Sequence, residues 1–300
     1  MIIYITIILY SDLEEFTKNF LEIRYEYLPV ILLLVFFSLV AKSFRQLILL
    51  RKIGIDISVK ANFTIFFSGL SMQATPGGLG TMIKSQFIKK NYGHSLLKTM
   101  PVVLVERFHD LLSMITIIAI LSFFYQLIEI QLILAILIPI LIFSYLAVRR
   151  EKILVFFVNR LLKIKFLSKS IQNLFESKET LQALSTKKIL LSCWGISLFG
   201  LTLEAISIYY SFIAFNLDFG IIETTLITFA SFVIGAASFI PGGIGLTEAS
   251  LIGLLVLSKV ELATASSLAI FIRLTTIWYA TSMGFIATRI MFSRKNNINI

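Results

Sequence analysis

The 300-residue chain has little that redox or metal chemistry could use, because it contains one cysteine and two histidines. A single thiol, Cys193, cannot form a disulfide within the chain, and with His94 and His109 it offers no zinc arrangement. Charge is scarce too, at 15% of residues, whereas 57% are hydrophobic. This balance excludes an ordinary soluble domain and predicts a protein that crosses a membrane several times.

The sequence also lacks the common motifs of nucleotide and hydrolytic chemistry. It has no Walker motif, no Rossmann fingerprint after a strand, no nucleophile elbow and no zinc-protease signature. We therefore predict no catalytic residues, no metal, no cofactor and no ATP hydrolysis by this chain.

Long apolar runs rich in Leu, Ile and Phe make up most of the sequence. Five approach or exceed the roughly 20 residues that a helix needs to cross a bilayer, at about 28–50, 101–124, 131–148, 188–215 and 262–290. Their continuous apolar character favours helices, which satisfy their own backbone hydrogen bonds in lipid. The predicted fold is an all-α, polytopic membrane helical bundle. Residues 1–10 suggest a truncated or interfacial first helix, with a misplaced start codon as the alternative.

The formal net charge of +10 lies mostly in the connections between the apolar runs. In a soluble protein such a charge would suggest nucleic acid, but here the positive-inside rule applies and we expect no nucleic-acid partner. The basic connections near residues 51–60 and 149–188, and the basic C-terminal end, are predicted to be cytoplasmic in a cell membrane. The connection 149–188 alternates basic and apolar residues, which predicts an interfacial helix on an anionic leaflet.

One short phrase occurs twice, each time inside apolar sequence: Thr75-Pro76-Gly77-Gly78-Leu79-Gly80 and Ile240-Pro241-Gly242-Gly243-Ile244-Gly245. Proline ends a preceding helix, and glycine accepts a positive φ and lets another group approach the main chain. A helix that restarts after the phrase presents free N–H groups and the positive end of its dipole, which suits an anion such as phosphate. The alternative is that the glycines only allow tight helix packing.

The predicted orientation of the spans makes the two phrases inverted copies of each other. Segment 61–98 enters and leaves from the cytoplasm, whereas segment 221–259 enters and leaves from outside. We therefore predict a single integral membrane domain, 1–300, with two broken or re-entrant helices at the Pro-Gly-Gly motifs. Repeat one covers about 28–148, a basic cytoplasmic connection 149–187, and repeat two 188–290, as in many transporters.

An arginine follows each motif at nearly the same distance along the chain, Arg107 in the first repeat and Arg273 in the second. Ionisable residues inside spans are costly, so they are functional candidates. Arg273 and Glu248 could pair across the second repeat. Glu106, His109 and Asp110 share one helical face, and Arg107 can reach toward Asp110. The alternative for this cluster is an internally neutralised structural network.

Other charges in the apolar runs have simpler expected roles. Lys42 and Arg45 lie near the predicted cytoplasmic end of their span and are expected to snorkel to the interface. Glu204, alone in its span, is a candidate partner for one of the arginines. Lys84 follows the first motif by about one turn and could either assist an anion there or snorkel.

The first motif followed by a basic helix, and the second continuing as Pro-Gly-Gly-Ile-Gly-Leu-Thr-Glu to Glu248, resemble the flippase-like transmembrane domain of the lysylphosphatidylglycerol synthase family. The resemblance covers about residues 28–290. It implies movement of a phospholipid between leaflets, and these 300 residues contain no soluble aminoacyl transferase domain, so it argues against lysyl transfer. The sequence departs from the family pattern at Lys84, where many relatives have an acidic residue.

These observations together give the hypothesis of an ATP-independent, flippase-like translocator of a phospholipid or polyprenyl-linked lipid head group. The predicted substrate-binding residues are Pro76, Gly77, Gly78, Gly80, Lys84, Glu106, Arg107, Asp110, Pro241, Gly242, Gly243, Gly245, Glu248 and Arg273. One alternative is a membrane-embedded transferase for a lipid phosphate, with Glu106, His109 or Asp110 as general base. Another is an accessory subunit that partners a lipid-modifying enzyme.

Overall fold

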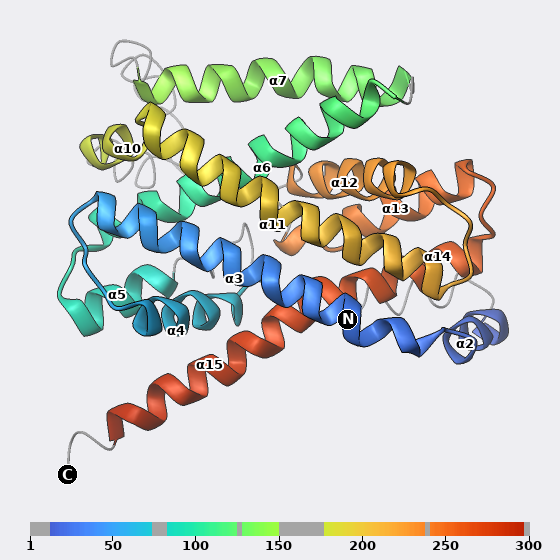
Figure 1. Ribbon diagram of the computed structural model, residues 1–300, viewed down its shortest axis with the longest axis horizontal. Helices are drawn as coiled ribbons and strands as arrows, with labels where there is room; N and C mark the ends of the chain where they lie inside the picture. Colours follow the sequence, from blue (N-terminus) through green and yellow to red (C-terminus); the bar gives the residue numbers. More distant parts are fainter. Residues whose placement is uncertain (1–12, 74–82, 125–127, 150–176, 238–240, 297–300) are drawn as a thin grey trace, which may run out of the picture.

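The structure, a computed structural model, describes residues 13–73, 83–124, 128–149, 177–237 and 241–296, and all regular structure among them is helical. The prediction of an all-α bundle is confirmed. The elements, drawn in Figure 1, are α2 (Leu13–Leu21), η1 (Tyr25–Tyr27), α3 (Leu28–Lys52), α4 (Val59–Leu70), α5 (Ile83–Tyr92), α6 (Leu96–Ser122), α7 (Ile128–Arg149), α10 (Lys178–Leu184), α11 (Lys187–Ala214), α12 (Ile221–Ala237), η3 (Pro241–Gly243), α13 (Leu246–Leu257), α14 (Leu262–Arg273), η4 (Leu274–Trp278) and α15 (Tyr279–Asn296).

The five predicted spans correspond to α3, α6, α7, α11 and the continuous run α14–η4–α15. Three described stretches, Tyr25–Lys52, Lys187–Ala214 and Leu262–Met291, are long and apolar enough to cross a membrane by length and composition. Helix α6 begins earlier than its hydropathy predicts. The reason is a cap, since the Ser95 hydroxyl accepts a hydrogen bond from the Lys98 backbone N–H at 3.3 Å.

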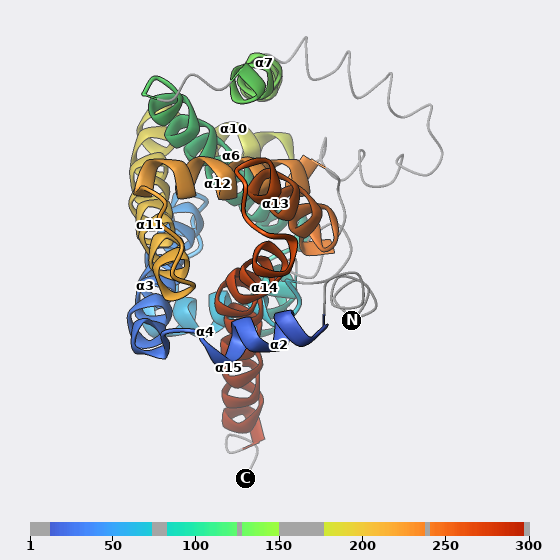
Figure 2. The same cartoon turned by 90° about the vertical axis from the view of Figure 1, so that its right-hand side faces the viewer.

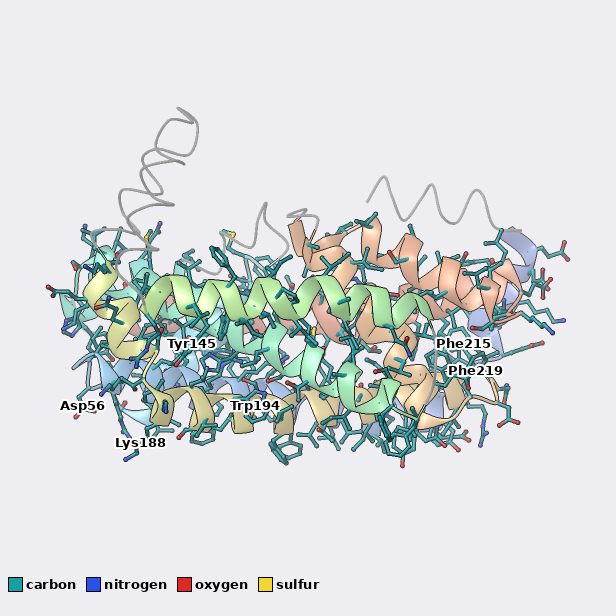
Figure 3. All side chains as sticks on the ribbon, turned by 90° about the horizontal axis from the view of Figure 1, so that it is seen from above. Asp56, Tyr145, Lys188, Trp194, Phe215 and Phe219 are labelled. Atoms are coloured by element: carbon teal, nitrogen blue, oxygen red, sulfur yellow. The ribbon has the colours of Figure 1, made fainter. Side chains whose placement is uncertain are left out.

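Two helical hairpins, α4–α5 and α12–α13, point in opposite directions (Figure 1). The first opens toward the end of the molecule where Asp56 and Lys188 lie, and the second toward the end with Phe215 and Phe219 (Figure 3). The same order, a long helix, a hairpin and a second long helix, occurs twice, in α3–α6 and in α11–α15. The second motif lies between α12 and α13. Residues 76–80 of the first motif lie outside the described residues.

Helices α3 and α11 lie side by side and run in opposite directions (Figure 1), and Figure 2 shows both along one side of the molecule. Their approach is close at Gly200, where an added Cβ would lie 3.4 Å from the Ser38 carbonyl oxygen. Helix α7 packs mainly against α6 and α10, and Figure 2 shows it at one edge, away from α3, α4 and α15.

The last helix, α15, packs against α4, just before the first motif in the chain. The backbones touch here, because a Cβ on Gly284 would lie 2.2 Å from the Ser71 backbone nitrogen. Thr288 Oγ1 also donates to the Ser68 carbonyl oxygen at 3.4 Å. A π-helical turn, η4, immediately follows Arg273 in the same long run.

The predicted first helix at residues 1–10 lies outside the described residues, and so does most of the predicted interfacial helix in 149–187. Of that connection, the structure describes α10 and the turn at Ser177 that precedes it, where the Ser177 hydroxyl donates to the Leu97 carbonyl oxygen at 2.8 Å. This bond ties the connection to the first turn of α6.

Candidate functional site

The second motif forms a tight 3-10 turn, η3, in which glycine is required. Gly242, Gly243 and Gly245 have φ values of 59°, 64° and 96°, in the left-handed region that other residues rarely adopt. The turn also packs directly on α12, because an added Cβ on Gly243 would lie 3.2 Å from the Gly235 backbone. The glycines therefore do allow close packing here, as the alternative interpretation proposed, and the backbone conformation gives them a second role.

The start of α13 is neutralised by the protein's own side chains. Glu248 Oε2 accepts a hydrogen bond of 2.6 Å from the Gly245 backbone N–H. Its other oxygen, Oε1, accepts from Arg273 Nε at 2.7 Å, and Arg273 Nη2 donates to the Gly242 carbonyl oxygen. The predicted Glu248–Arg273 pair is confirmed. Because Glu248 is fully buried and Arg273 nearly so, the carboxylate already occupies the place that an external anion would take at this helix end.

The described side of the first hairpin has a different arrangement. Lys84, in the first turn of α5, lies 2.6 Å from Glu106 Oε2 on α6, and both side chains are buried. The Lys84 ammonium also lies 4.9 Å from the centre of the Phe66 ring. Gly69 makes room for the lysine stem, since a Cβ there would lie 2.2 Å from Lys84 Cγ. Lys84 therefore does not snorkel to the interface.

The two hairpins thus carry the same kind of ion pair with the charges reversed. In each, the helix that follows the motif supplies one charge and the next helix supplies the other. Helix α13 supplies the acid Glu248 and α14 the base Arg273, whereas α5 supplies the base Lys84 and α6 the acid Glu106. The first turn of α5 contains no acidic residue. Sequence spacing matched Arg107 to Arg273, but the residue that pairs with the helix after the motif is its neighbour, Glu106.

Two further ion pairs connect α3 to its neighbours. Arg45 Nη1 lies 2.6 Å from Asp110 Oδ1 on α6 and donates to the Ser197 hydroxyl on α11 at 2.6 Å. Lys42 lies 2.8 Å from Glu204 on α11. The expectation that Lys42 and Arg45 snorkel is wrong, because partners on adjacent helices hold both inside the bundle. The sequence did not indicate the partners of Lys42 and Arg45. The only signal for these pairs was the presence of opposite charges in separate spans.

Arg107 is the exception among these charges. It lies on α6 beside Glu106, yet its side chain is exposed, and it forms no ion pair with another described residue. Asp110, its expected partner, is taken by Arg45. An arginine that is unpaired within a membrane-spanning helix is a candidate to meet an anion from outside the chain.

Three polar atoms on the inward face of α6 have no hydrogen-bond partner: Glu106 Oε1, His109 Nε2 and Ser113 Oγ. The other ring nitrogen of His109, Nδ1, lies 2.7 Å from the Val105 carbonyl oxygen, which assigns the proton to Nδ1 in the neutral ring. All three residues are buried. Buried polar groups are nearly always paired with protein or water, so these atoms mark a place for water or for a bound polar group.

Fold and charges together define a polytopic helical membrane protein with two oppositely directed hairpins and a buried ion pair beside the turn of each. Residues 1–284 match the family described as "Lysylphosphatidylglycerol synthase TM region". The chain therefore belongs to this family.

Two curated relatives carry a name that states no activity. The chain is 28% identical over 221 residues to a "UPF0104 membrane protein" of Methanocaldococcus jannaschii, which covers 70% of this chain and 89% of the relative. It is 31% identical over 91 residues to another "UPF0104 membrane protein" from Methanothermobacter thermautotrophicus, covering 30% of this chain and 27% of that protein.

Proposed function

We propose that the protein moves a phospholipid or a lipid-linked head group between the leaflets of a cell membrane without using ATP. The observation that carries this proposal is the contrast between two arginines. Arg273 is buried and donates hydrogen bonds to Glu248 and Gly242, whereas Arg107 is exposed and forms no ion pair with another described residue. A lipid phosphate is an anion that an arginine can bind through two parallel hydrogen bonds. Arg107 is then its first contact.

The first hairpin offers further support for a phosphate near Arg107. The described first turn of α5 carries Lys84 and no acid. A positively charged residue there adds to the positive end of the helix dipole instead of cancelling it. The predicted substrate residues Pro76, Gly77, Gly78 and Gly80 would complete this side. On the second side, Pro241, Gly242, Gly243 and Gly245 would shape the opposing hairpin.

Translocation by this arrangement requires access from each leaflet in turn. The hairpins point in opposite directions, as in transporters built from inverted repeats, in which one half moves against the other around a central site. We infer two repeats, about 28–148 and 188–290, and hairpins that re-enter the membrane from opposite sides. The basic connections 51–60 and 149–188 meet at the end that holds Asp56 and Lys188 (Figure 3), so this end, with the C-terminus, is assigned to the cytoplasm.

The test is lipid exchange between leaflets of proteoliposomes that contain the purified protein, followed by mass spectrometry of the same lipids. We expect accelerated exchange with unchanged lipid masses. Arg107→Ala should slow exchange about tenfold or more, since a hydrogen bond to a charged group contributes about 1.5–3 kcal/mol. The control is Arg289→Ala, an exposed arginine on α15. Equal exchange in the Arg107 variant, the Arg289 variant and the unaltered protein would refute the role of Arg107.

The unpartnered Glu106 Oε1 and His109 Nε2 favour one second candidate, a transferase that acts on a lipid phosphate. Both groups lie on the same face of α6, within reach of one polar ligand. The same assay separates the two functions, because a transferase changes the mass of the lipid when a donor is supplied. Unchanged masses with no exchange would favour the third alternative, an accessory subunit of a lipid-modifying system.

A further inference from the structure

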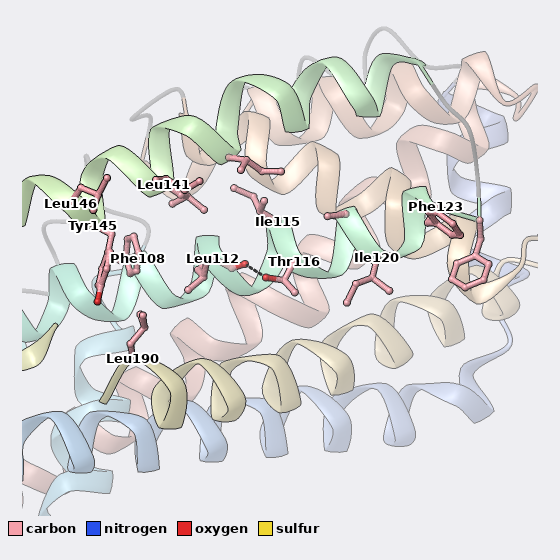
Figure 4. A pocket seen from close by; sticks show the side chains of 14 residues that line it. Phe108, Leu112, Ile115, Thr116, Ile120, Phe123, Leu141, Tyr145, Leu146 and Leu190 are labelled. Carbon is pink, nitrogen blue, oxygen red and sulfur yellow. Dashed lines mark hydrogen bonds between the residues drawn. The ribbon is translucent and has the colours of Figure 1, made fainter. Parts of the chain in front are cut away.

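A groove of about 770 Å³ lies between α6 and α7 (Figure 4), and none of the residues that line it belongs to the ion pairs. Its lining is almost entirely aliphatic and aromatic: Phe108, Leu112, Ile115, Ala119, Ile120, Phe123, Phe124, Ile138, Leu141, Ile142, Leu146 and Leu190, together with Thr116 and Tyr145. The volume is within the range of about 300–1,000 Å³ that is usual for sites that bind small ligands.

The hydroxyls of the two polar lining residues already donate their protons to backbone carbonyl oxygens of the protein. The Thr116 hydroxyl donates to the Leu112 carbonyl oxygen at 2.7 Å, and the Tyr145 hydroxyl donates to the Ser185 carbonyl oxygen at 3.4 Å. The first of these bonds is drawn in Figure 4. The groove therefore suits an apolar occupant. Its length along α6, from Phe108 to Phe123, is about 22 Å at 1.5 Å per residue, which covers most of the roughly 30 Å hydrocarbon core.

One end of the groove is basic. Arg149 lies one turn beyond Leu146 on α7, and Lys187 lies one turn before Leu190 on α11, and both are exposed. The two helix ends are held together by the bond from Tyr145 to Ser185. The opposite end carries exposed Phe123 and Phe124. A ligand that matches this order has a negative charge at one end and a long hydrocarbon chain behind it.

Helix α7 also exposes apolar side chains that a hydrocarbon chain would cover. Large apolar side chains on two of its sides are exposed, including Ile136 and Ile140 on one and Ile138 and Ile142 on the groove side. We propose that the groove between α6 and α7 binds one anionic membrane lipid, with a hydrocarbon chain between the two helices and the head group at Arg149 and Lys187. This site is separate from the ion pairs of the proposed translocation site.

The volume favours a lipid chain over a helix from a second copy of the protein. A helix with its side chains is at least about 10 Å wide, so 22 Å of helix fills roughly 1,700 Å³. This is more than the about 1,420 Å³ of all the empty space between the atoms of the groove, its open mouth included. A single hydrocarbon chain is much thinner and can bend to follow the groove.

The test is lipid retention by the full-length chain. The protein is equilibrated with vesicles of equal parts phosphatidylglycerol and phosphatidylcholine, then extracted in mild detergent and examined by native mass spectrometry. We expect one retained phosphatidylglycerol per chain. Two separate variants, Thr116→Phe and Ala119→Phe, should reduce this retention at least tenfold by filling the groove. Their matched control is Leu191→Phe, at an exposed position on α11 outside the groove.

The charged end is tested by Arg149→Gln combined with Lys187→Gln, which should abolish the preference for phosphatidylglycerol over phosphatidylcholine. Its control combines Lys52→Gln with Lys60→Gln, two exposed lysines at the same end of the molecule. Retention that is equal for both lipids, or unchanged in all these variants, would overturn the proposal. A lipid-free dimer that the groove-filling variants separate would overturn it in favour of a second copy of the chain.

Discussion

The two hairpins differ most in which of their charged side chains form ion pairs within the protein. In the second, Glu248 caps α13 and binds Arg273, so the motif, the helix end and the arginine are hydrogen-bonded to one another. In the first, Lys84 takes the position after the motif and pairs with Glu106, which leaves the adjacent Arg107 exposed. The start of α13 is thus capped by a carboxylate from its own first turn. The first turn of α5 has a lysine in place of that acid. This difference is the reason for our proposal that the first hairpin binds the lipid and the second stabilises the fold.

The largest expected effect is at Glu248. Glu248→Ala leaves Arg273 buried without its carboxylate and the Gly245 N–H without its acceptor. Removal of one partner from a buried pair costs about 3–5 kcal/mol. Thermal unfolding in detergent should show a correspondingly large loss of stability. The matched control is the double variant Glu248→Met with Arg273→Met, which removes both charges and should recover much of this loss. If Glu248→Ala is as stable as the unaltered protein, the Glu248–Arg273 pair does not stabilise the fold.

A smaller loss is expected at the first hairpin. Lys84→Met leaves Glu106 without its partner, but a carboxyl group can accept a proton and lose its charge, whereas a guanidinium cannot. The cost is then that of an unsatisfied polar group, about 1–3 kcal/mol. The same unfolding measurement should show a smaller loss of stability for Lys84→Met than for Glu248→Ala. Equal losses at both hairpins would remove the distinction.

The smallest change in stability, and the sharpest test of function, is a reversal of the first pair. Lys84→Glu combined with Glu106→Lys keeps the ion pair but places an acid in the first turn of α5, as in α13. We expect stability within about 1 kcal/mol of the original and lipid exchange slower by about tenfold, because the acid competes with phosphate for the helix end. Exchange at the original rate would show that the order of charges in the first hairpin does not matter.

Hydropathy predicted the long helices well because the length of a membrane-spanning helix is set by the bilayer and is visible along the chain. The partners of the buried charges depend on which helix faces are in contact, and this information is not local. Neighbouring residues on a helix point about 100° apart. This rotation is why equal spacing from the motifs selected Arg107, although its neighbour Glu106 forms the pair. Arg45 shows the same limit, since its partners Asp110 and Ser197 come from two other helices.

The Glu248–Arg273 pair could be predicted because both residues lie in one repeat, on consecutive helices. Residues 76–80 remain a prediction from the sequence, as does the binding of substrate by either motif. The groove between α6 and α7 had no counterpart in the sequence interpretation. Its lining residues are indistinguishable from other lipid-facing residues until the angle between the two helices is known.

The contact of Gly284 with Ser71 has a mechanical consequence. It brings the backbone of the last long helix against the final turn of α4, with no side chain between them to yield. Any larger side chain at position 284 would therefore push α15 away from the end of α4 that leads into the first motif.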